Sequence, residues 1–216
     1  MNTRLVIFDL DGTLLHTIGD LAVACNAALA LRGLPQHSYD DYCGFVGNGI
    51  MRLVERALPE PLRSPDNVAL MRADFVRYYT EHIDVRTKPY PGIPELLAGL
   101  AQRGVRLAVA SNKFQTGTEK LVRRFFPDIR FDPVFGQREG VPLKPDPAVA
   151  EEILRLTATP REQALFVGDS GIDILTAKAA GIRSVGVTWG FRARAELEQA
   201  GADRLVDRAE ELLDLL

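Results

Sequence analysis

The chain has 216 residues, of which 46% are apolar and 25% charged, with 29 acidic against 26 basic side chains. These fractions are typical of a soluble globular protein, so they exclude disordered, collagen-like and coiled-coil chains. The net charge of −3 gives no electrostatic reason to expect a nucleic-acid partner. No apolar run approaches the ~20 residues that a membrane span needs, so no membrane partner is expected either.

Two further features bear on the compartment. Cys25 and Cys43 are too few for a disulfide framework, and their spacing does not suit a zinc site. The N-terminus lacks the basic, apolar and small-residue segments of a signal sequence, because a strand-like run already begins at Arg4. We therefore expect a cytoplasmic protein. Its oligomeric state, monomer or homodimer, stays open.

Short apolar runs alternate with helical patterns along most of the chain. Runs typical of strands buried on both faces occupy residues 4–8, 105–110, 164–167, 184–187 and 204–206. Apolar residues at helical spacing lie between them, at residues 93–100, 149–156 and 174–180. This alternation predicts an α/β protein with a doubly wound parallel sheet.

Residues 15–88 break the alternation, because they contain helical patterns and no convincing strand. A helical insertion directly after the first strand predicts a small second domain above the sheet. We therefore expect a core domain of residues 1–14 and 89–216 and a helical cap domain of residues 15–88.

Two helix starts are expected within the insertion. Thr17 with Asp20 resembles a capping box that opens an alanine-rich helix. Ser64-Pro65 is typical of a second helix start. The aromatic residues of that second helix are interpreted as packing inside the cap.

Polar side chains follow three of the predicted strands. In open α/β sheets, ligands bind beyond the carboxyl ends of the strands. The residues concerned, with one lysine from a loop before a helix, are Asp9 and Asp11, Ser111 and Asn112, Lys144, and Asp169 with Asp173. Carboxylates crowded at the end of a buried strand repel each other and cost desolvation, which a divalent cation would relieve. Oxygen ligands without histidine or cysteine favour Mg²⁺ over zinc.

In this order, these residues resemble the four motifs of the haloacid dehalogenase (HAD) superfamily of phosphotransferases. The motifs are Asp9-Leu10-Asp11-Gly12-Thr13, Ser111-Asn112, Lys144-Pro145-Asp146-Pro147, and Gly168-Asp169-Ser170 with Asp173. The resemblance implies a Rossmann-like HAD core, and the helical insertion looks like the α-helical C1 cap of the family.

Within the superfamily, the chain is most similar to the bacterial phosphoglycolate phosphatases. The segments that carry this similarity are Val46-Gly47-Asn48-Gly49, Val54-Glu55-Arg56-Ala57-Leu58, Arg77-Tyr78-Tyr79, Ser111-Asn112-Lys113 and Gly186-Val187-Thr188-Trp189-Gly190-Phe191. The similarity implies a Mg²⁺-dependent hydrolase that splits 2-phosphoglycolate, a small phosphate monoester, into glycolate and phosphate.

The resemblance also implies roles for the motif residues. Asp9 would attack phosphorus and become an aspartyl phosphate. Asp11 would act as general acid and then as general base. Lys144 and Ser111 would hold phosphoryl oxygens, with Thr13 and Asn112 as further substrate contacts. Magnesium would be held by Asp9, Asp169 and the backbone carbonyl of Asp11, with Asp173 either as a direct ligand or one shell further out.

Recognition of the rest of the substrate is expected from the insertion. Gly47-Asn48-Gly49 is interpreted as a flexible turn that closes over substrate, although a tight loop before a helix would use the same residues. Arg52 follows the turn and is expected to meet a substrate carboxylate. Arg56 could share its face or pair with Glu60 at the surface. Lys113 fits a surface role and a site role equally.

Several alternatives share the same motifs. A sugar phosphomutase, a nucleotidase and a pyrophosphatase all remain open, because they differ from a phosphatase in cap closure rather than in motif residues. A non-catalytic phosphate-binding protein is a further alternative. The competent residue at every predicted catalytic position argues against it.

Overall fold

Six parallel strands form the central sheet of the computed structural model, which describes residues 3–215. The order across the sheet is β5-β4-β1-β6-β7-β8. The strands are β1 (Leu5–Phe8), β4 (Arg106–Phe114), β5 (Phe131–Gln137), β6 (Ala164–Gly168), β7 (Arg183–Val187) and β8 (Arg204–Val206). The chain therefore runs outward from β1 in both directions, which confirms the predicted doubly wound α/β sheet and creates a crevice where the direction reverses.

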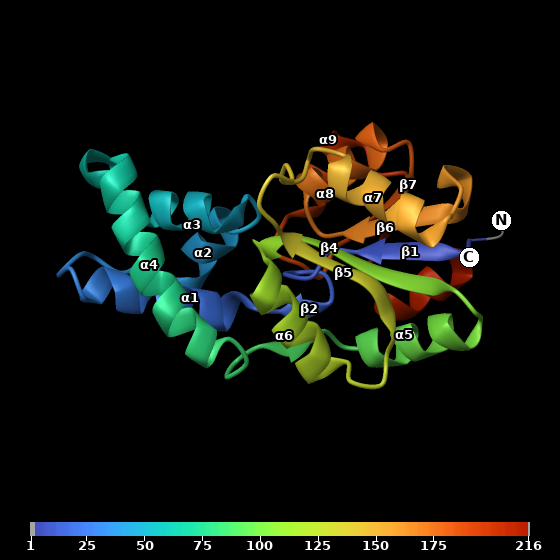
Figure 1. Cartoon of the computed structure of the whole chain (residues 1–216), viewed down its shortest axis with the longest axis horizontal. Helices are drawn as coiled ribbons and strands as arrows, with labels where there is room; N and C mark the ends of the chain where they lie inside the picture. The colour runs from blue at the N-terminus through green and yellow to red at the C-terminus, as the bar shows by residue number, and fades with distance from the viewer. Residues whose placement is uncertain (1–2, 216) are drawn as a thin grey trace.

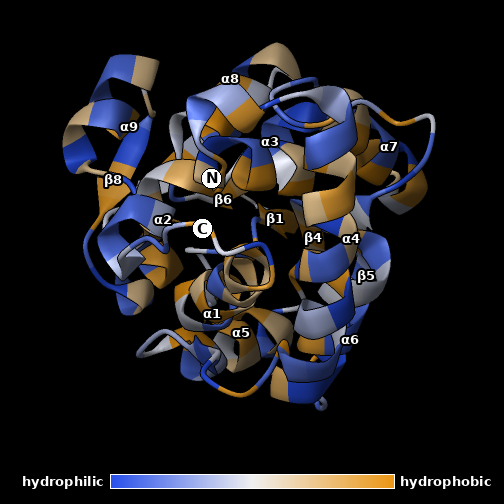
Figure 2. Ribbon diagram, turned by 90° about the vertical axis from the view of Figure 1, so that its left-hand side faces the viewer, coloured by the Kyte–Doolittle hydropathy of each residue, from blue (hydrophilic) through white to orange (hydrophobic). Residues whose placement is uncertain are grey.

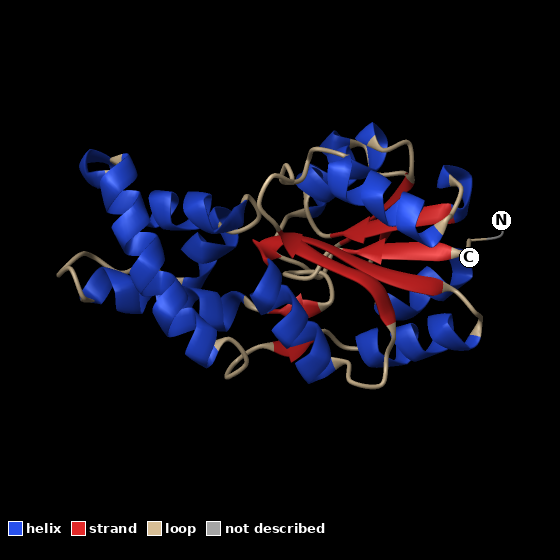
Figure 3. Cartoon of the chain, in the orientation of Figure 1, coloured by secondary structure: helices blue, strands red, loops and turns tan. Residues whose placement is uncertain are grey.

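Helices cover both faces of this sheet (Figure 3). On one face lie α7 (Ala148–Thr157) and α8 (Gly171–Ala179), with α9 (Arg194–Ala200) beside α8, and on the other lie α5 (Ile93–Gln102) and α6 (Gln115–Phe125). Short 3₁₀ turns complete the core: η2 (Arg161–Gln163) and η3 (Ala209–Leu215).

Strand β1 shows why its sequence is apolar throughout. Successive side chains of a strand point to opposite faces. Leu5 and Ile7 join the buried cluster under α7 and α8, whereas Val6 and Phe8 join the larger cluster on the other face. A strand with both faces covered has no solvent side, so no polar alternation can appear in it.

Four helices of residues 15–88 stand beyond the carboxyl ends of the strands (Figure 1), and we call them the cap helices. They are α1 (Ile18–Ala30), α2 (Tyr39–Phe45), α3 (Gly49–Ala57) and α4 (Pro65–His82), with η1 (Glu60–Leu62) before α4. Figure 2 looks from this end of the molecule, with the cap helices in front of the apolar strands β1 and β4. The start of α4 is as predicted, since Pro65 is its first residue and the Ser64 side chain accepts a hydrogen bond from the Asn67 amide.

A short two-stranded ribbon connects the cap helices to the sheet. β2 (Leu15–His16) pairs antiparallel with β3 (Lys88–Pro89). The predicted capping box of Thr17 with Asp20 is wrong, because the Thr17 side chain caps nothing in α1. The Asp20 carboxylate instead accepts hydrogen bonds from the backbone amides of Arg86 and Thr87 at 2.9–3.0 Å. Asp20 thereby ties the incoming chain to the returning one.

Two strands differ from the sequence-based expectation. β4 continues four residues beyond Ala110, to Phe114, and so carries Ser111 and Asn112 within the strand. β5 was not predicted; it lies at the sheet edge and contains Pro133, which interrupts the strand pattern. Among residues 3–215, no helix combines the length and apolarity needed to cross a membrane.

Candidate active site

A cavity open to solvent lies between the carboxyl ends of the strands and the cap helices, and is lined by residues of both. Its two walls differ in chemistry. The wall from the core is polar and charged, and consists chiefly of Asp9, Asp11, Ser111, Asn112, Lys113, Lys144, Asp169, Ser170, Asp173 and Arg192. The wall from the cap helices is mainly apolar, with Leu21, Val46, Ile50, Leu53 and Phe75.

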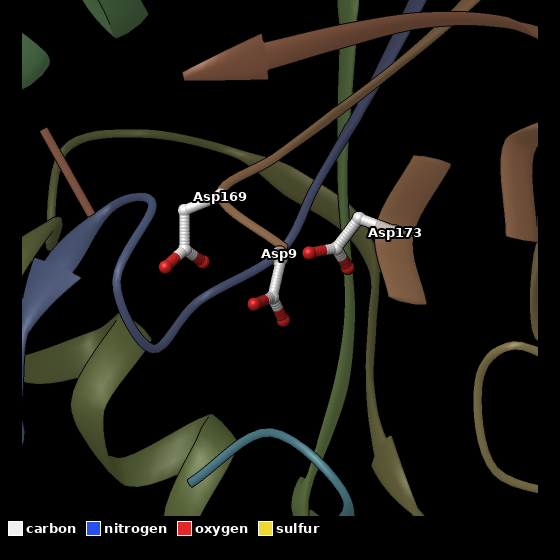
Figure 4. A group of neighbouring side chains, drawn as sticks. All are labelled: Asp9, Asp169 and Asp173. Atoms are coloured by element: carbon white, nitrogen blue, oxygen red, sulfur yellow. The ribbon is translucent and has the colours of Figure 1, made fainter. Parts of the chain in front are cut away.

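Three buried carboxylates converge at the floor of this cavity (Figure 4). Asp9 follows β1, Asp169 follows β6, and Asp173 lies in the first turn of α8. One oxygen of each lies within 4.8 Å of the others, close enough to share one metal ion. Because β1 and β6 are neighbours in the sheet, the fold itself brings Asp9 and Asp169 together.

Asp169 is held on several sides. Its carboxylate accepts hydrogen bonds from the Thr13 hydroxyl at 3.2 Å and from the Phe191 amide at 2.7 Å. The backbones of Gly12 and Gly190 pack so closely against it that an added Cβ would lie 2.3 Å and 2.2 Å from the nearest Asp169 atom. Glycine at both positions therefore makes room for this carboxylate. Thr13, predicted to bind substrate, is not among the residues that line the cavity, and its hydroxyl is engaged by Asp169.

Lys144 lies between two of the carboxylates. Its Nζ is 2.8 Å from Asp9 Oδ1 and 2.6 Å from Asp173 Oδ1. The second oxygen of Asp173 accepts from the amide and hydroxyl of Ser170, which makes Asp173 the third-position member of the α8 capping box. The position of Asp173 is thus fixed by hydrogen bonds within its own helix start, independently of Lys144.

Burial dominates the electrostatics of the cluster. It raises the pKa of Asp9 to about 7, and although Lys144 opposes this shift, the charge of Asp173 adds to it. Burial, together with the charges of Asp173 and Asp9, raises the pKa of Asp169 well above its ordinary value. For Lys144, burial acts to lower the pKa, but the charges of Asp173 and Asp9 outweigh it and hold the pKa above its usual range. The single positive charge of Lys144 is thus shared between Asp9 and Asp173.

These observations test whether the cluster suits a divalent cation. The donor set consists of carboxylate oxygens, which magnesium prefers. The raised pKa values of Asp9 and Asp169 show that their negative charge is poorly compensated by the protein alone. The cluster therefore fits Mg²⁺.

Strand β4 supplies the next group of side chains. Ser111 lines the cavity, and its Oγ accepts a 3.3 Å hydrogen bond from the Lys113 amide. Asn112 also lines the cavity, but its polar atoms are engaged by backbone. Its Nδ2 donates to the carbonyl oxygens of Lys144 and Gly47, both at 3.0 Å, and its Oδ1 accepts from the Lys144 amide at 2.9 Å. Asn112 thus ties two segments to β4: the loop that carries Lys144, and the turn Gly47-Asn48-Gly49, which we call the cap turn.

The Asp11 carboxylate, which is not one of the three acids at the cavity floor, pairs with Lys113. Lys113 Nζ lies 3.0 and 3.3 Å from the two Asp11 oxygens and 2.7 Å from the hydroxyl of Tyr79 on α4. The Lys113 side chain is only 3% exposed, which decides for a site role. Tyr79 and Phe75, expected only to pack within the cap, also line the cavity.

The cap turn is built differently from the sequence-based expectation. Gly47 and Gly49 line the cavity with positive φ values of 118° and 79°. Asn48 and Arg52 lie outside the cavity wall. The Arg52 side chain is 64% exposed and pairs with Glu55, so the structure does not bring it to the cavity.

Arg56 stabilises the cap turn through two hydrogen bonds. Its guanidinium donates to the Asn48 side chain at 2.8 Å and to the Phe45 carbonyl at 2.9 Å. It makes no ion pair with Glu60 among the described residues. Asn48 and Arg56 therefore stabilise the turn, and Gly47 and Gly49 are the parts of it that line the cavity.

Arg192, which sequence reasoning missed, joins the core to the cap. It lines the cavity, and its guanidinium donates to the carbonyl oxygens of Cys43 at 2.9 Å and Val46 at 2.6 Å. These carbonyls end α2, where a cation is favourable. No motif spacing marks this arginine, because its partners lie almost 150 residues away in the sequence.

A model of the family described as haloacid dehalogenase-like hydrolase matches residues 6–187, most of the chain. The chain belongs to the haloacid dehalogenase-like hydrolases. This hydrolase is 36% identical to a Mesorhizobium japonicum protein named phosphoglycolate phosphatase, over 90% of this chain and 86% of that protein. It is 35% identical to one of the same name from Pectobacterium atrosepticum, over 99% and 92%. These matches confirm both resemblances drawn from the sequence.

The solved structures agree with the fold. The hydrolase superimposes on a protein from Lactobacillus delbrueckii subsp. bulgaricus, named as a candidate phosphoglycolate phosphatase, with a TM-score of 0.94 and 34% sequence identity. The match covers 100% of this chain and 98% of that one. The core and the cap helices thus share one arrangement with that relative.

Proposed function

We propose that this hydrolase is a magnesium-dependent phosphate monoesterase that acts through an aspartyl phosphate on Asp9, with 2-phosphoglycolate as its substrate. The observation that carries the proposal is the position of Asp9. It lies at the cavity floor, with Lys144 on one side and two further carboxylates around it. The names of the curated relatives support the choice of ester.

Asp9 is the nucleophile in this proposal. One of its carboxylate oxygens forms a bond to phosphorus while the bond from phosphorus to the ester oxygen breaks. Water then attacks the aspartyl phosphate, which releases inorganic phosphate and restores the carboxylate. The attack requires an ionised Asp9, and Lys144 at 2.8 Å favours that form.

Asp11 handles the protons. It donates one to the leaving alkoxide in the first half of the reaction and accepts one from the attacking water in the second. Its carboxylate is oriented by Lys113.

The phosphoryl group is held by the core. Lys144 and Ser111 contact its oxygens, and Lys144 offsets the repulsion between a phosphate dianion and the surrounding acids. Asp9, Asp169, Asp173 and the Asp11 backbone carbonyl would hold Mg²⁺, which when bound neutralises charge on the transferred phosphoryl group. Thr13 and Asn112 support the site by holding Asp169 and Lys144 respectively.

We further propose that residues 15–88 act as a cap that moves on the β2–β3 ribbon relative to a core of residues 1–14 and 89–216. The two-stranded connection supports this division. Opening admits substrate, and closing brings the apolar cap wall over the leaving group.

The test is a panel of phosphate esters compared by kcat/KM with Mg²⁺ present. It includes 2-phosphoglycolate, hexose phosphates, nucleoside monophosphates, pyrophosphate and an aryl phosphate. We expect phosphate release that EDTA abolishes and Mg²⁺ restores, with 2-phosphoglycolate the best substrate. A better hexose phosphate, nucleotide or pyrophosphate would move the assignment to the corresponding enzyme class, and release of no phosphate from any ester would indicate a binding protein.

A further inference from the structure

The cavity itself shows how the leaving group is recognised. The core residues described above all serve the phosphoryl group, the metal site or the cap turn, so the far end of the substrate needs another partner. On the cap side, that end faces Leu21, Ile50, Leu53 and Phe75. In the part of the chain that the structure describes, no charged side chain of residues 15–88 lines the cavity. A negatively charged leaving group must therefore be recognised from the core.

Three cations of the core line the cavity. Lys144 is engaged by Asp9 and Asp173 on the phosphoryl side. Arg192 donates to the backbone carbonyls at the end of α2. Lys113 is the third, and it faces the same space as Asp11, the residue that serves the leaving group.

The geometry of Lys113 leaves it able to bind an anion. An ammonium group has three protons to donate. The acceptors around Nζ are the two Asp11 oxygens, at 3.0 and 3.3 Å, and the Tyr79 hydroxyl, at 2.7 Å, and the Tyr79 ring lies 4.7 Å from Nζ, which further stabilises the cation. The two Asp11 oxygens belong to one carboxylate, so a ligand in the cavity can take over the proton of the longer, 3.3 Å contact while Asp11 keeps the shorter one.

We propose that Lys113 determines substrate choice by binding an anionic group, a carboxylate, one carbon from the ester oxygen of the substrate. This inference rests on the proposed phosphatase function and names the residue that reads its substrate. Tyr79 is a positioning residue, because it acts through Lys113.

Distances support this assignment. To transfer its proton, Asp11 must come within about 3 Å of the ester oxygen, and Lys113 Nζ is 3.0 Å from Asp11. The ammonium group therefore lies no more than about 6 Å from the ester oxygen. A carboxylate joined to that oxygen through one methylene has its own oxygens roughly 3 Å away, three bonds along. It can then receive a charge-assisted hydrogen bond of about 2.8 Å from Lys113.

The apolar cap wall further narrows the range of substrates. A sugar phosphate would place several hydroxyls against Leu53 and Phe75, where they find no hydrogen-bond partner. A short leaving group with one carboxylate presents only a methylene to this wall and its charge to Lys113. The favoured class is thus a small phosphate ester of a 2-hydroxy acid.

The test uses two esters of matched shape. Ethyl phosphate has a methyl group where 2-phosphoglycolate has its carboxylate. Because Lys113 also contacts Asp11, Lys113→Met will slow both reactions, so the measured quantity is the ratio of their kcat/KM values. We expect the wild type to prefer 2-phosphoglycolate and Lys113→Met to lower this preference by about tenfold to a hundredfold. An unchanged ratio would show that Lys113 only orients Asp11 and would overturn the proposal.

Two further measurements keep the outcome clear. Tyr79→Phe keeps the ring and removes the hydroxyl, so it should reduce the preference several-fold even if Lys113→Met does not fold. Binding of both esters to the Asp9→Asn protein, with and without Lys113→Met, should show the same selective loss by calorimetry. A wild type that hydrolyses other esters but does not prefer 2-phosphoglycolate to ethyl phosphate would overturn the role of Lys113 and leave the phosphatase function standing. Absence of any hydrolysis would overturn both.

Discussion

Gly12 offers a direct test of the way the fold positions Asp169. Gly12 has a φ of +94°, and a Cβ added to it would lie 2.3 Å from Asp169 Oδ2, where ordinary contacts begin at 3.4 Å. In Gly12→Ala the Asp169 carboxylate must therefore move by about 1 Å, and a shift of this size in a catalytic group costs on the order of 10²-fold. The positive φ adds about 1–2 kcal/mol of backbone strain to the folded state.

Gly104→Ala is the matched control, because Gly104 has a similar φ of +75° and nothing within 4 Å of its added Cβ. Urea unfolding should show a similar backbone cost in both variants, with a further loss in Gly12→Ala from weakened hydrogen bonds to Asp169. Phosphate release is then measured against Mg²⁺ concentration. Gly12→Ala should have a lower kcat/KM and a higher half-saturating Mg²⁺ concentration than the wild type, and Gly104→Ala should have neither. Wild-type kcat/KM and Mg²⁺ half-saturation in Gly12→Ala would refute the argument that Asp169 holds the metal from this position.

Three further outcomes are expected. Asp9→Asn should lose at least ~10³-fold in kcat while its thermal unfolding stays cooperative, and near-normal turnover of the pure variant would refute the covalent step. Because burial raises the pKa of Asp9 to about 7, protons compete with Mg²⁺ in the metal-free enzyme; the half-saturating Mg²⁺ concentration should rise as the pH falls below 7, up to about tenfold per pH unit, and an unchanged Mg²⁺ requirement between pH 8 and 6 would contradict this. Arg52→Ala should change kcat/KM for 2-phosphoglycolate less than twofold or so and the free energy of unfolding by less than about 0.5 kcal/mol, since its ion pair is exposed; a selective tenfold loss would restore the arginine to substrate recognition.

The sheet could be predicted from local patterns wherever a strand is covered on both faces. β1, β6 and β7 were recognised from their apolar residues, nearly all of which are buried. The short edge strand β8 also has the predicted bounds, 204–206. β5 lies at the edge, is only partly buried and contains Pro133, so it lacks the continuous apolar run of a central strand. Residues that follow β1, β4 and β6 were expected to meet at one edge, and parallel pairing of neighbouring strands brings them there.

The parts of the site that escaped prediction depend on distant partners. Lys113 pairs with Asp11 across 102 positions, and a lysine beside a motif has no spacing that separates burial from exposure. Asp20 was interpreted as part of a capping box because Thr17 lies at the right spacing. Its carboxylate instead accepts hydrogen bonds from backbone amides 66 and 67 positions away. Arg52 is the opposite case: it was expected to meet a distant partner, but it pairs with Glu55, three residues away on the same helix. Local sequence patterns therefore predict helices and strands well, but they predict contacts between residues distant in the sequence poorly.

The β2–β3 ribbon has a consequence for how enzymes of this design can diversify. Residues 15–88 leave and re-enter the core at Leu15 and Pro89, which are paired neighbours, so the insertion imposes no separation on β1 and β4. A different set of helices could be grafted onto the same two residues without altering the register of the sheet or the acids at its edge. The apolar wall over the leaving group can thus be exchanged as one unit. The residues proposed to transfer the phosphoryl group, and Lys113, remain in the core.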